Sequence, residues 1–280
     1  MPDKYTRFAV HNFSALETAK FSPKEYSRLK FGCDTAARNL GHELATEFFA
    51  AHSDKLLANR CVVISSPYNH VPNAATVMTM HFIDRLNELL VFARGEHVEY
   101  SVIHRKVSYT NDYGFLSKEK RRGLIDNDSF YLNRDFIEGK LLIFVDDVRI
   151  TGTHEDKLVE ILGRDGVDNE AMFLYYANYH GNQPDIEGKL NFSGMTGLDY
   201  YLEMSKEQDH HVIIRPIKFI LGQKADVLKD ALPKLADHIV IKMYHGCLAE
   251  GYYKIPGYQR AFGLLAAEKE KRVAKKQGSL

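Results

Sequence analysis

A pair of acidic residues and a threonine-glycine-threonine turn follow the most strand-like segment of the chain. In chain order the parts are the apolar run 141–145, Asp146, Asp147, Thr151, Gly152 and Thr153. A turn that enters a helix presents backbone N–H groups to a phosphate, the threonines add hydroxyl donors, and glycine lets the anion approach the backbone. The acids would repel a phosphate placed on them, but they can accept hydrogen bonds from sugar hydroxyls or support a hydrated divalent cation. These residues together predict a site for a sugar phosphate.

The elements around this segment predict a parallel sheet. Apolar, strand-like runs alternate with helical patterns: the runs are 60–65, 98–104, 141–145 and 171–177, and the helical patterns include 74–92 and 154–162. Nearly continuous apolar strands that alternate with helices are typical of a parallel sheet covered on both faces. Ligands of such sheets bind outside the carboxyl ends of the strands. We therefore expect an α/β, Rossmann-like core with the acids and the turn at its ligand-binding edge.

Helical patterns flank this predicted core on both sides. Ser22 and Pro23 followed by Glu25 form a good helix start, and apolar residues then recur at helical spacing. After residue 180 a connection rich in Gly, Asn and Pro leads into helical patterns that end in a basic tail. We expect a helical N-terminal segment at 1–58, an α/β core at 59–180 and a mostly helical C-terminal extension at 181–280.

Composition narrows the class of protein. The 280 residues include 37 Lys+Arg and 37 Asp+Glu, so the basic excess usual for a nucleic-acid-binding protein is missing. Three widely spaced cysteines, Cys33, Cys61 and Cys247, match no zinc or disulfide pattern and are typical of buried thiols in a reducing compartment. The N-terminus has no apolar signal core, and no run is long enough to cross a bilayer. We expect a cytoplasmic protein with neither a nucleic acid nor a membrane as partner.

The segment 141–154 resembles the signature by which type I phosphoribosyltransferases bind phosphoribosyl pyrophosphate (PRPP). In that family an apolar strand, an acidic pair and a Thr/Ser-Gly-Thr loop follow one another. The resemblance implies the type I phosphoribosyltransferase fold and catalytic roles for Asp146 and Asp147, facing the ribose hydroxyls. It also implies that the loop binds the 5-phosphate through Arg149, Ile150, Thr151, Gly152, Thr153 and His154.

Two positions differ from common versions of this signature. Ile150 stands where several members have Thr, or an Asp proposed as a base in some purine enzymes, and His154 stands where many have Thr. Ile150 excludes a side-chain base at this position. The ending Gly152-Thr153-His154 is closer to that of the orotate enzymes.

A second similarity lies upstream of the signature. Arg105 and Lys106 follow the predicted strand 98–104 directly, and a long polar stretch separates them from Gly139-Lys140. This order resembles the Arg-Lys segment, mobile loop and Gly-Lys lead-in of orotate-type members, which implies catalytic roles for Arg105 and Lys106 in neutralising pyrophosphate. Further pyrophosphate contacts are expected in the polar stretch and after the first core strand, at Lys118, Lys120, Arg121, Ser66 and Tyr68. A solvated charge cluster is the alternative interpretation of the basic residues in the stretch.

The resemblance implies a reaction in which a nitrogen nucleophile attacks C1 of PRPP and pyrophosphate leaves. Our first hypothesis is therefore a phosphoribosyltransferase acting on a nitrogenous base or related heterocycle. Mg²⁺ is the implied cofactor, bound through PRPP near Asp146 and Asp147 rather than by a direct protein metal site. The small-molecule acceptor would be held by a hood formed from residues 14–58 or 180–280, and a homodimer is compatible with the family.

Two other hypotheses remain open. One is a non-catalytic regulatory module of the same fold that senses PRPP or a nucleotide, since the family includes such members. The other is a hydrolase-like phosphate site on a different doubly wound fold, which the Thr-Gly-Thr ending disfavours. A fainter similarity, at residues 26–34, is to the bacterial ComF-like phosphoribosyltransferases, some of which are associated with tellurite-resistance gene clusters.

Overall fold

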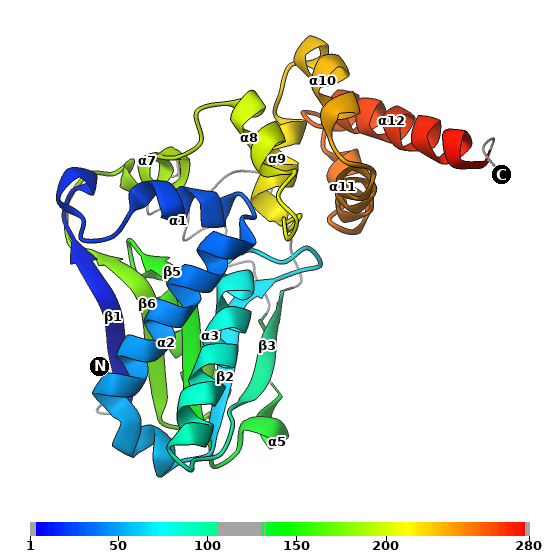
Figure 1. Ribbon diagram of the computed structural model, residues 1–280. Helices are drawn as coiled ribbons and strands as arrows, with labels where there is room; N and C mark the ends of the chain where they lie inside the picture. Colours follow the sequence, from blue (N-terminus) through cyan, green and yellow to red (C-terminus); the bar gives the residue numbers. More distant parts are fainter. Residues whose placement is uncertain (1–3, 106–129, 132, 278–280) are drawn as a thin grey trace.

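A six-stranded sheet in the order β1-β6-β5-β2-β3-β4 runs through the computed structural model, which describes residues 4–105, 130–131 and 133–277 (Figure 1). The strands are β1 (Tyr5–Phe13), β2 (Cys61–Tyr68), β3 (Glu99–Arg105), β4 (Phe130–Tyr131), β5 (Leu141–Arg149) and β6 (Ala171–Tyr179). All neighbours from β1 to β3 are parallel, and β4 pairs antiparallel with β3. The carboxyl ends of the five parallel strands therefore meet at one edge of the sheet.

Strand β1 departs from the helical N-terminal segment expected for residues 1–58. It pairs in register with β6, with Tyr5 opposite Ala171 and Phe13 opposite Tyr179. Polar residues such as Arg7 interrupt its apolar pattern, because an edge strand is only partly buried and tolerates them. The sheet consequently extends beyond the core expected at 59–180.

Helices cover both faces of the sheet. Helices α2 (Asp34–Leu57) and α3 (Ala74–Phe92) lie together on one face (Figure 1). Their backbones approach so closely that a Cβ on Gly41 would come within 2.6 Å of the Met78 carbonyl oxygen. Helix α6 (Thr153–Arg164) packs through Leu162 on the opposite face, and the short α5 (Arg134–Ile137) contributes Ile137 there.

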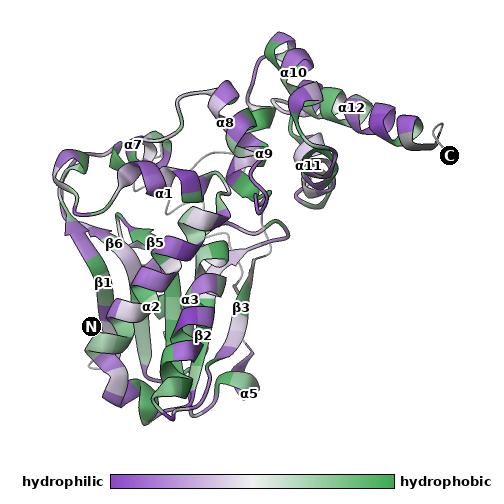
Figure 2. Ribbon diagram, in the orientation of Figure 1, coloured by the Kyte–Doolittle hydropathy of each residue, from purple (hydrophilic) through white to green (hydrophobic). Residues whose placement is uncertain are grey.

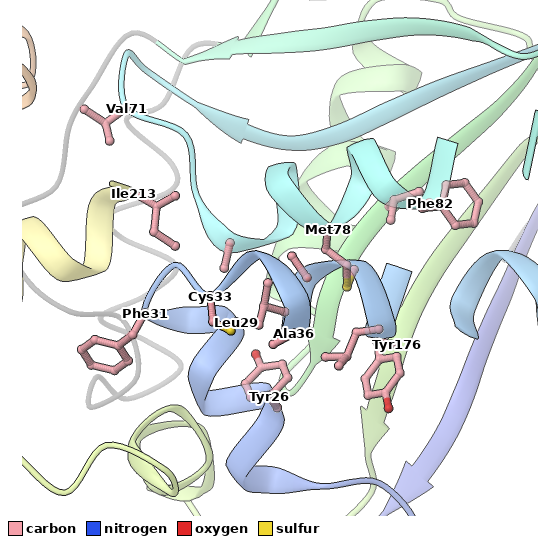
Figure 3. Close-up of a cluster of buried hydrophobic side chains, with 14 of the residues drawn as sticks. Tyr26, Leu29, Phe31, Cys33, Ala36, Val71, Met78, Phe82, Tyr176 and Ile213 are labelled. Atoms are coloured by element: carbon pink, nitrogen blue, oxygen red, sulfur yellow. The ribbon is translucent and has the colours of Figure 1, made fainter. Parts of the chain in front are cut away.

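Alternate residues of the central strands enter two separate apolar clusters. Val62, Leu142 and Phe173 belong to the cluster that includes α6, whereas their neighbours belong to the cluster beneath α2 and α3. Figure 2 shows hydrophobic residues concentrated in β2 and β5, at the centre of the sheet. Figure 3 shows part of the second cluster, with Tyr26 and Met78 among the labelled side chains. Burial on both faces explains why these strands lack a polar alternation.

A layer of short helices lies beyond the carboxyl edge of the sheet (Figure 1). It consists of α1 (Pro23–Lys30), α7 (Ile186–Phe192), α8 (Leu198–Met204) and α9 (Ile214–Leu221). Helices α10 (Ala225–Ala231), α11 (Asp237–Ala249) and α12 (Gln259–Gln277) extend from this layer. The described residues also include the 3-10 turns η1 (Leu16–Thr18), η3 (Leu232–Lys234) and η4 (Tyr252–Lys254). The larger apolar cluster continues from the sheet into these helices, so the C-terminal extension shares the core. Within the described ranges, no helix is both long and apolar enough to span a membrane.

Candidate functional site

A cleft of about 210 Å³ opens where the carboxyl ends of β2 and β5 face the helical layer. Its floor is formed by residues 146–155 and by the end of β2 with the loop that follows it. Side chains from the flanking helices complete its walls: Lys30, Glu187, Arg215, Lys218, Glu250 and Tyr252. The cleft therefore brings the predicted sugar-phosphate segment together with residues more than 100 positions away in the chain.

The predicted phosphate turn lies at the start of α6 and lines this cleft. Gly152 adopts φ +76° as the residue that caps the helix, a left-handed conformation that suits glycine. The hydroxyls of Thr151 and Thr153 lie 2.9 Å apart, and the Thr153 N–H donates to the Thr151 hydroxyl at 3.4 Å. Hydroxyls and a helix N-terminus thus converge on the cleft, in the arrangement expected for a phosphate site.

The other residues of the predicted 5-phosphate set have different surroundings. Ile150 packs against the apolar cluster, so its side chain is unsuited to a polar ligand. Arg149 donates from Nε to Glu155 at 2.8 Å, and its Nη2 lies 2.4 Å from the position that a Cβ on Gly152 would occupy. His154 lines the cleft with Nδ1 3.6 Å from Asp146 Oδ2. All three residues are at the cleft, but Arg149 and Ile150 support the turn rather than extend from it.

The two acids at the end of β5 are not equivalent. Asp147 is buried, accepts the Val148 N–H at 2.7 Å on Oδ1 and forms an ion pair with Lys30 through Oδ2. Asp146 keeps 23% of its side chain exposed and accepts the Asp147 N–H at 3.0 Å on Oδ1. Asp146 is thus the acid that faces the open cleft.

Beneath the turn, a buried carboxylate joins three strands to α6. Glu155 accepts hydrogen bonds from Arg7 of β1 at 2.9 Å, from Arg149 at 2.8 Å and from the Tyr175 hydroxyl of β6 at 3.0 Å. Burial by itself would raise the pKa of Glu155, but the hydrogen bonds and charges of the two arginines outweigh it and lower the pKa. Burial beside this carboxylate also raises the pKa of Tyr175, which therefore donates as a neutral phenol. The ionised Glu155 fixes the first turn of α6, a role that the sequence did not indicate because Arg7 is 148 residues away.

The end of β2 forms the opposite wall. Ser66 and Tyr68, expected in a loop, belong to β2 and line the cleft. The loop after them donates the N–H groups of His70 and Val71 to Glu250, at 2.9 and 2.7 Å. Glu250 is a buried residue of the C-terminal extension, and no motif in the sequence indicates its role.

A model of the family described as "PRTase ComF-like" matches residues 5–265. The chain belongs to the PRTase ComF-like family. The predicted membership in the type I phosphoribosyltransferases and the predicted parallel-sheet α/β fold are thereby confirmed. A comparison with curated proteins gives no match.

Solved structures similar to this ComF-like chain include two hypoxanthine phosphoribosyltransferases. The enzyme from Staphylococcus aureus is 11% identical, with a TM-score of 0.34 over 52% of this chain and 76% of that chain. A variant from Trypanosoma cruzi, in complex with the product IMP, is 16% identical, with a TM-score of 0.35 over 54% of this chain and 77% of that chain.

Several predicted pyrophosphate contacts of the ComF-like chain lie beyond what the structure describes. Arg105 ends β3, two strands from β5 in the sheet. Lys106, Lys118, Lys120 and Arg121 lie outside the described residues. Their contact with pyrophosphate stays a prediction.

Proposed function

We propose that this chain binds PRPP and transfers its 5-phosphoribosyl group to a nitrogenous base or related heterocycle, with release of pyrophosphate. The observation that supports it best is that one cleft joins a phosphate-type turn at a helix start with a partly exposed carboxylate, Asp146. The 5-phosphate would be bound by Thr151, Gly152 and Thr153, and the ribose hydroxyls would donate to Asp146. Membership in a phosphoribosyltransferase family agrees with this placement.

In this reaction the protein mainly has to position the two reactants and neutralise the leaving pyrophosphate. A nitrogen lone pair forms the new bond to C1 of PRPP, the bond from C1 to the pyrophosphate oxygen breaks, and its electron pair leaves with pyrophosphate. The ring passes through an oxocarbenium-like state, which a carboxylate at the ribose, such as Asp146, would stabilise. Holding both reactants in line beneath the helical layer would supply much of the rate.

The residues of the cleft fit a hydrated Mg²⁺ that enters with PRPP. Asp146 offers a hard carboxylate oxygen that is partly exposed at the cleft. Mg²⁺ bound there would neutralise the charge of the pyrophosphate.

Isothermal titration calorimetry with PRPP and Mg²⁺ tests the proposal. Asp146→Asn should weaken binding by about tenfold or more, since a hydrogen bond to a charged group contributes roughly 1.5–3 kcal/mol. Asp54→Asn is the matched control, because Asp54 is exposed on α2 and is not among the cleft residues. Absence of PRPP binding by the unmodified protein would remove the proposal.

A regulatory module that binds PRPP or a nucleotide without turnover is the second candidate. The observation in its favour is that Glu250 already accepts the N–H groups of the loop after β2, at the wall where pyrophosphate is expected. Pyrophosphate release, assayed across purines, pyrimidines and orotate, separates the two functions. Release with any acceptor establishes the transferase, whereas tight PRPP binding without release from the whole panel favours the module.

A further inference from the structure

The two acids of the PRPP signature have unequal access to a ligand. Both oxygens of Asp147 are engaged, Oδ1 by the Val148 N–H and Oδ2 by Lys30, and 6% of its side chain is exposed. The exposed fraction of the Asp146 side chain is 23%. A ribose hydroxyl can therefore reach Asp146 Oδ2 beside the His154 imidazole, which lies 3.6 Å away, whereas it would have to displace Lys30 from Asp147.

Lys30 is a cation placed at the cleft by the helical layer. It is the last residue of α1 and lines the cleft, yet its side chain is 14% exposed. Its Nζ lies 5.5 Å from the centre of the Tyr26 ring, one helical turn earlier, and Tyr26 is fully buried. An ammonium group has three N–H donors, so the ion pair with Asp147 leaves donors for a second partner.

The end of α1 is itself fixed. Gly32 adopts φ +95°, and its carbonyl oxygen accepts the His211 N–H at 2.8 Å, which ties the turn after α1 to the segment that leads into α9. A Cβ on Gly32 would lie 2.1 Å from the His211 carbonyl oxygen, so this close approach requires glycine. Lys30 is thus held by its own helix, by Tyr26 and by Asp147 in one place.

We infer that Lys30 is a ligand-binding residue that donates hydrogen bonds to oxygen atoms of PRPP. Asp147 is then a positioning residue that holds the Lys30 ammonium, and Asp146 alone of the pair accepts from ribose. This assignment rests on the proposed function and divides two acids to which the family resemblance gives one role. It also gives the N-terminal helix a direct part in binding.

A double-mutant cycle tests the assignment by calorimetry with PRPP. Lys30→Met and Asp147→Asn should each weaken binding by about tenfold, because the first removes the charged hydrogen bond to the ligand and the second removes the carboxylate that positions its donor. The double variant should bind about as weakly as either single variant, since the two residues act as one unit. Asp146→Asn in the Lys30→Met background should instead weaken binding by a further factor of about ten.

Two measurements separate a role in binding from a role in folding. Lys30→Arg should recover most of the affinity lost in Lys30→Met, because it restores a cation that can pair with Asp147. If Lys30→Met and Asp147→Asn lower the melting temperature equally but leave the PRPP affinity unchanged, the Lys30–Asp147 pair serves only the fold. That result would overturn the inference. If Lys30→Met fails to fold, Lys30→Gln replaces it in the cycle.

The outcomes distinguish this inference from the proposed function. If Asp147→Asn weakens binding as much in the Lys30→Met background as in the unmodified protein, Asp147 contacts PRPP itself and the inference is wrong, while PRPP binding stands. If the unmodified protein does not bind PRPP, the proposed function fails and the assignment of Lys30 fails with it.

Discussion

Two loops at the carboxyl edge of the sheet present groups suited to an anion, and they use them differently. The turn at Thr151, Gly152 and Thr153 is supported from below by Glu155 and presents its hydroxyls to the cleft. The loop after β2 donates two consecutive N–H groups to Glu250, which arrives from the C-terminal extension. Groups suited to an anion therefore remain at the cleft in one loop, where we propose that a ligand binds, and are bonded to a carboxylate of the same chain in the other. The difference lies in the position of the nearest carboxylate: Glu155 lies beneath the turn, whereas Glu250 accepts directly from the N–H groups of the loop after β2.

Removing the Glu155 carboxylate beneath the turn should lower the free energy of unfolding more than the other changes considered below. Glu155→Gln leaves Arg7 and Arg149 without their buried counter-charge, so we expect the free energy of unfolding to fall by about 3 kcal/mol in urea titrations. Glu160→Gln is the control on the same helix, because the exposed Glu160 forms only an i,i+3 pair with Lys157, which contributes less than about 0.5 kcal/mol. Equal stability of the two variants would show that Glu155 does not support the turn.

Distorting the turn at Gly152 should remove the proposed anion-binding capacity that distinguishes it from the loop after β2. Gly152→Ala forces a side chain into a left-handed conformation and towards Arg149, at a cost of about 1–2 kcal/mol. We expect PRPP affinity, measured by calorimetry, to fall about tenfold. Gly163→Ala, in open space on the same helix, should leave the affinity unchanged. An unaltered affinity for Gly152→Ala would place the 5-phosphate elsewhere.

Weakening the hydrogen bonds from the loop after β2 to Glu250 should lower the stability by a smaller amount. Glu250→Gln replaces charge-assisted hydrogen bonds by neutral ones, so we expect a loss of about 1 kcal/mol in stability. Amide hydrogen exchange at His70 and Val71 should become faster. Glu203→Gln, on the exposed surface of α8, is the control. A rise in pyrophosphate affinity in Glu250→Gln would mean that the loop is a second anion site that Glu250 blocks.

Acid should lower the stability of the fold through two buried carboxylates, Glu155 at the cleft and Asp34 at the start of α2. Burial alone would raise the pKa of Asp34, but hydrogen bonds from His211 and His81 lower it, just as the arginines lower the pKa of Glu155. A lowered folded-state pKa means that the stabilisation is complete above the ordinary carboxyl pKa of about 4 and is lost as pH falls through the folded-state pKa. Urea unfolding between pH 7 and pH 3 should show a smaller acid loss for Asp34→Asn than for the unmodified protein. Equal losses would exclude Asp34 from this dependence.

The parts of the site that could be predicted are those whose components are consecutive. Residues 141–154 contain the strand, the acids and the turn in one stretch, so local pattern and family resemblance were sufficient. The ion pair of Lys30 with Asp147 spans 117 residues and the bonds to Glu250 span 179 and 180, and no periodicity links such positions. Strand β1 was missed for a related reason, because its partner is β6 and its edge position permits polar residues.

The pairing of β1 with β6 also sets an order of events during synthesis. Tyr5 leaves the ribosome long before Ala171, the residue opposite it in the sheet. At elongation rates of about 5–20 residues per second, roughly 10–30 s pass between the synthesis of β1 and that of its partner β6. During that interval it is an unpaired edge, and the charge on Arg7 and the polar His11 and Asn12 disfavour pairing with other nascent chains. The polar residues that obscured the strand pattern of β1 in the sequence are thus the ones that disfavour its pairing with other chains before β6 is made.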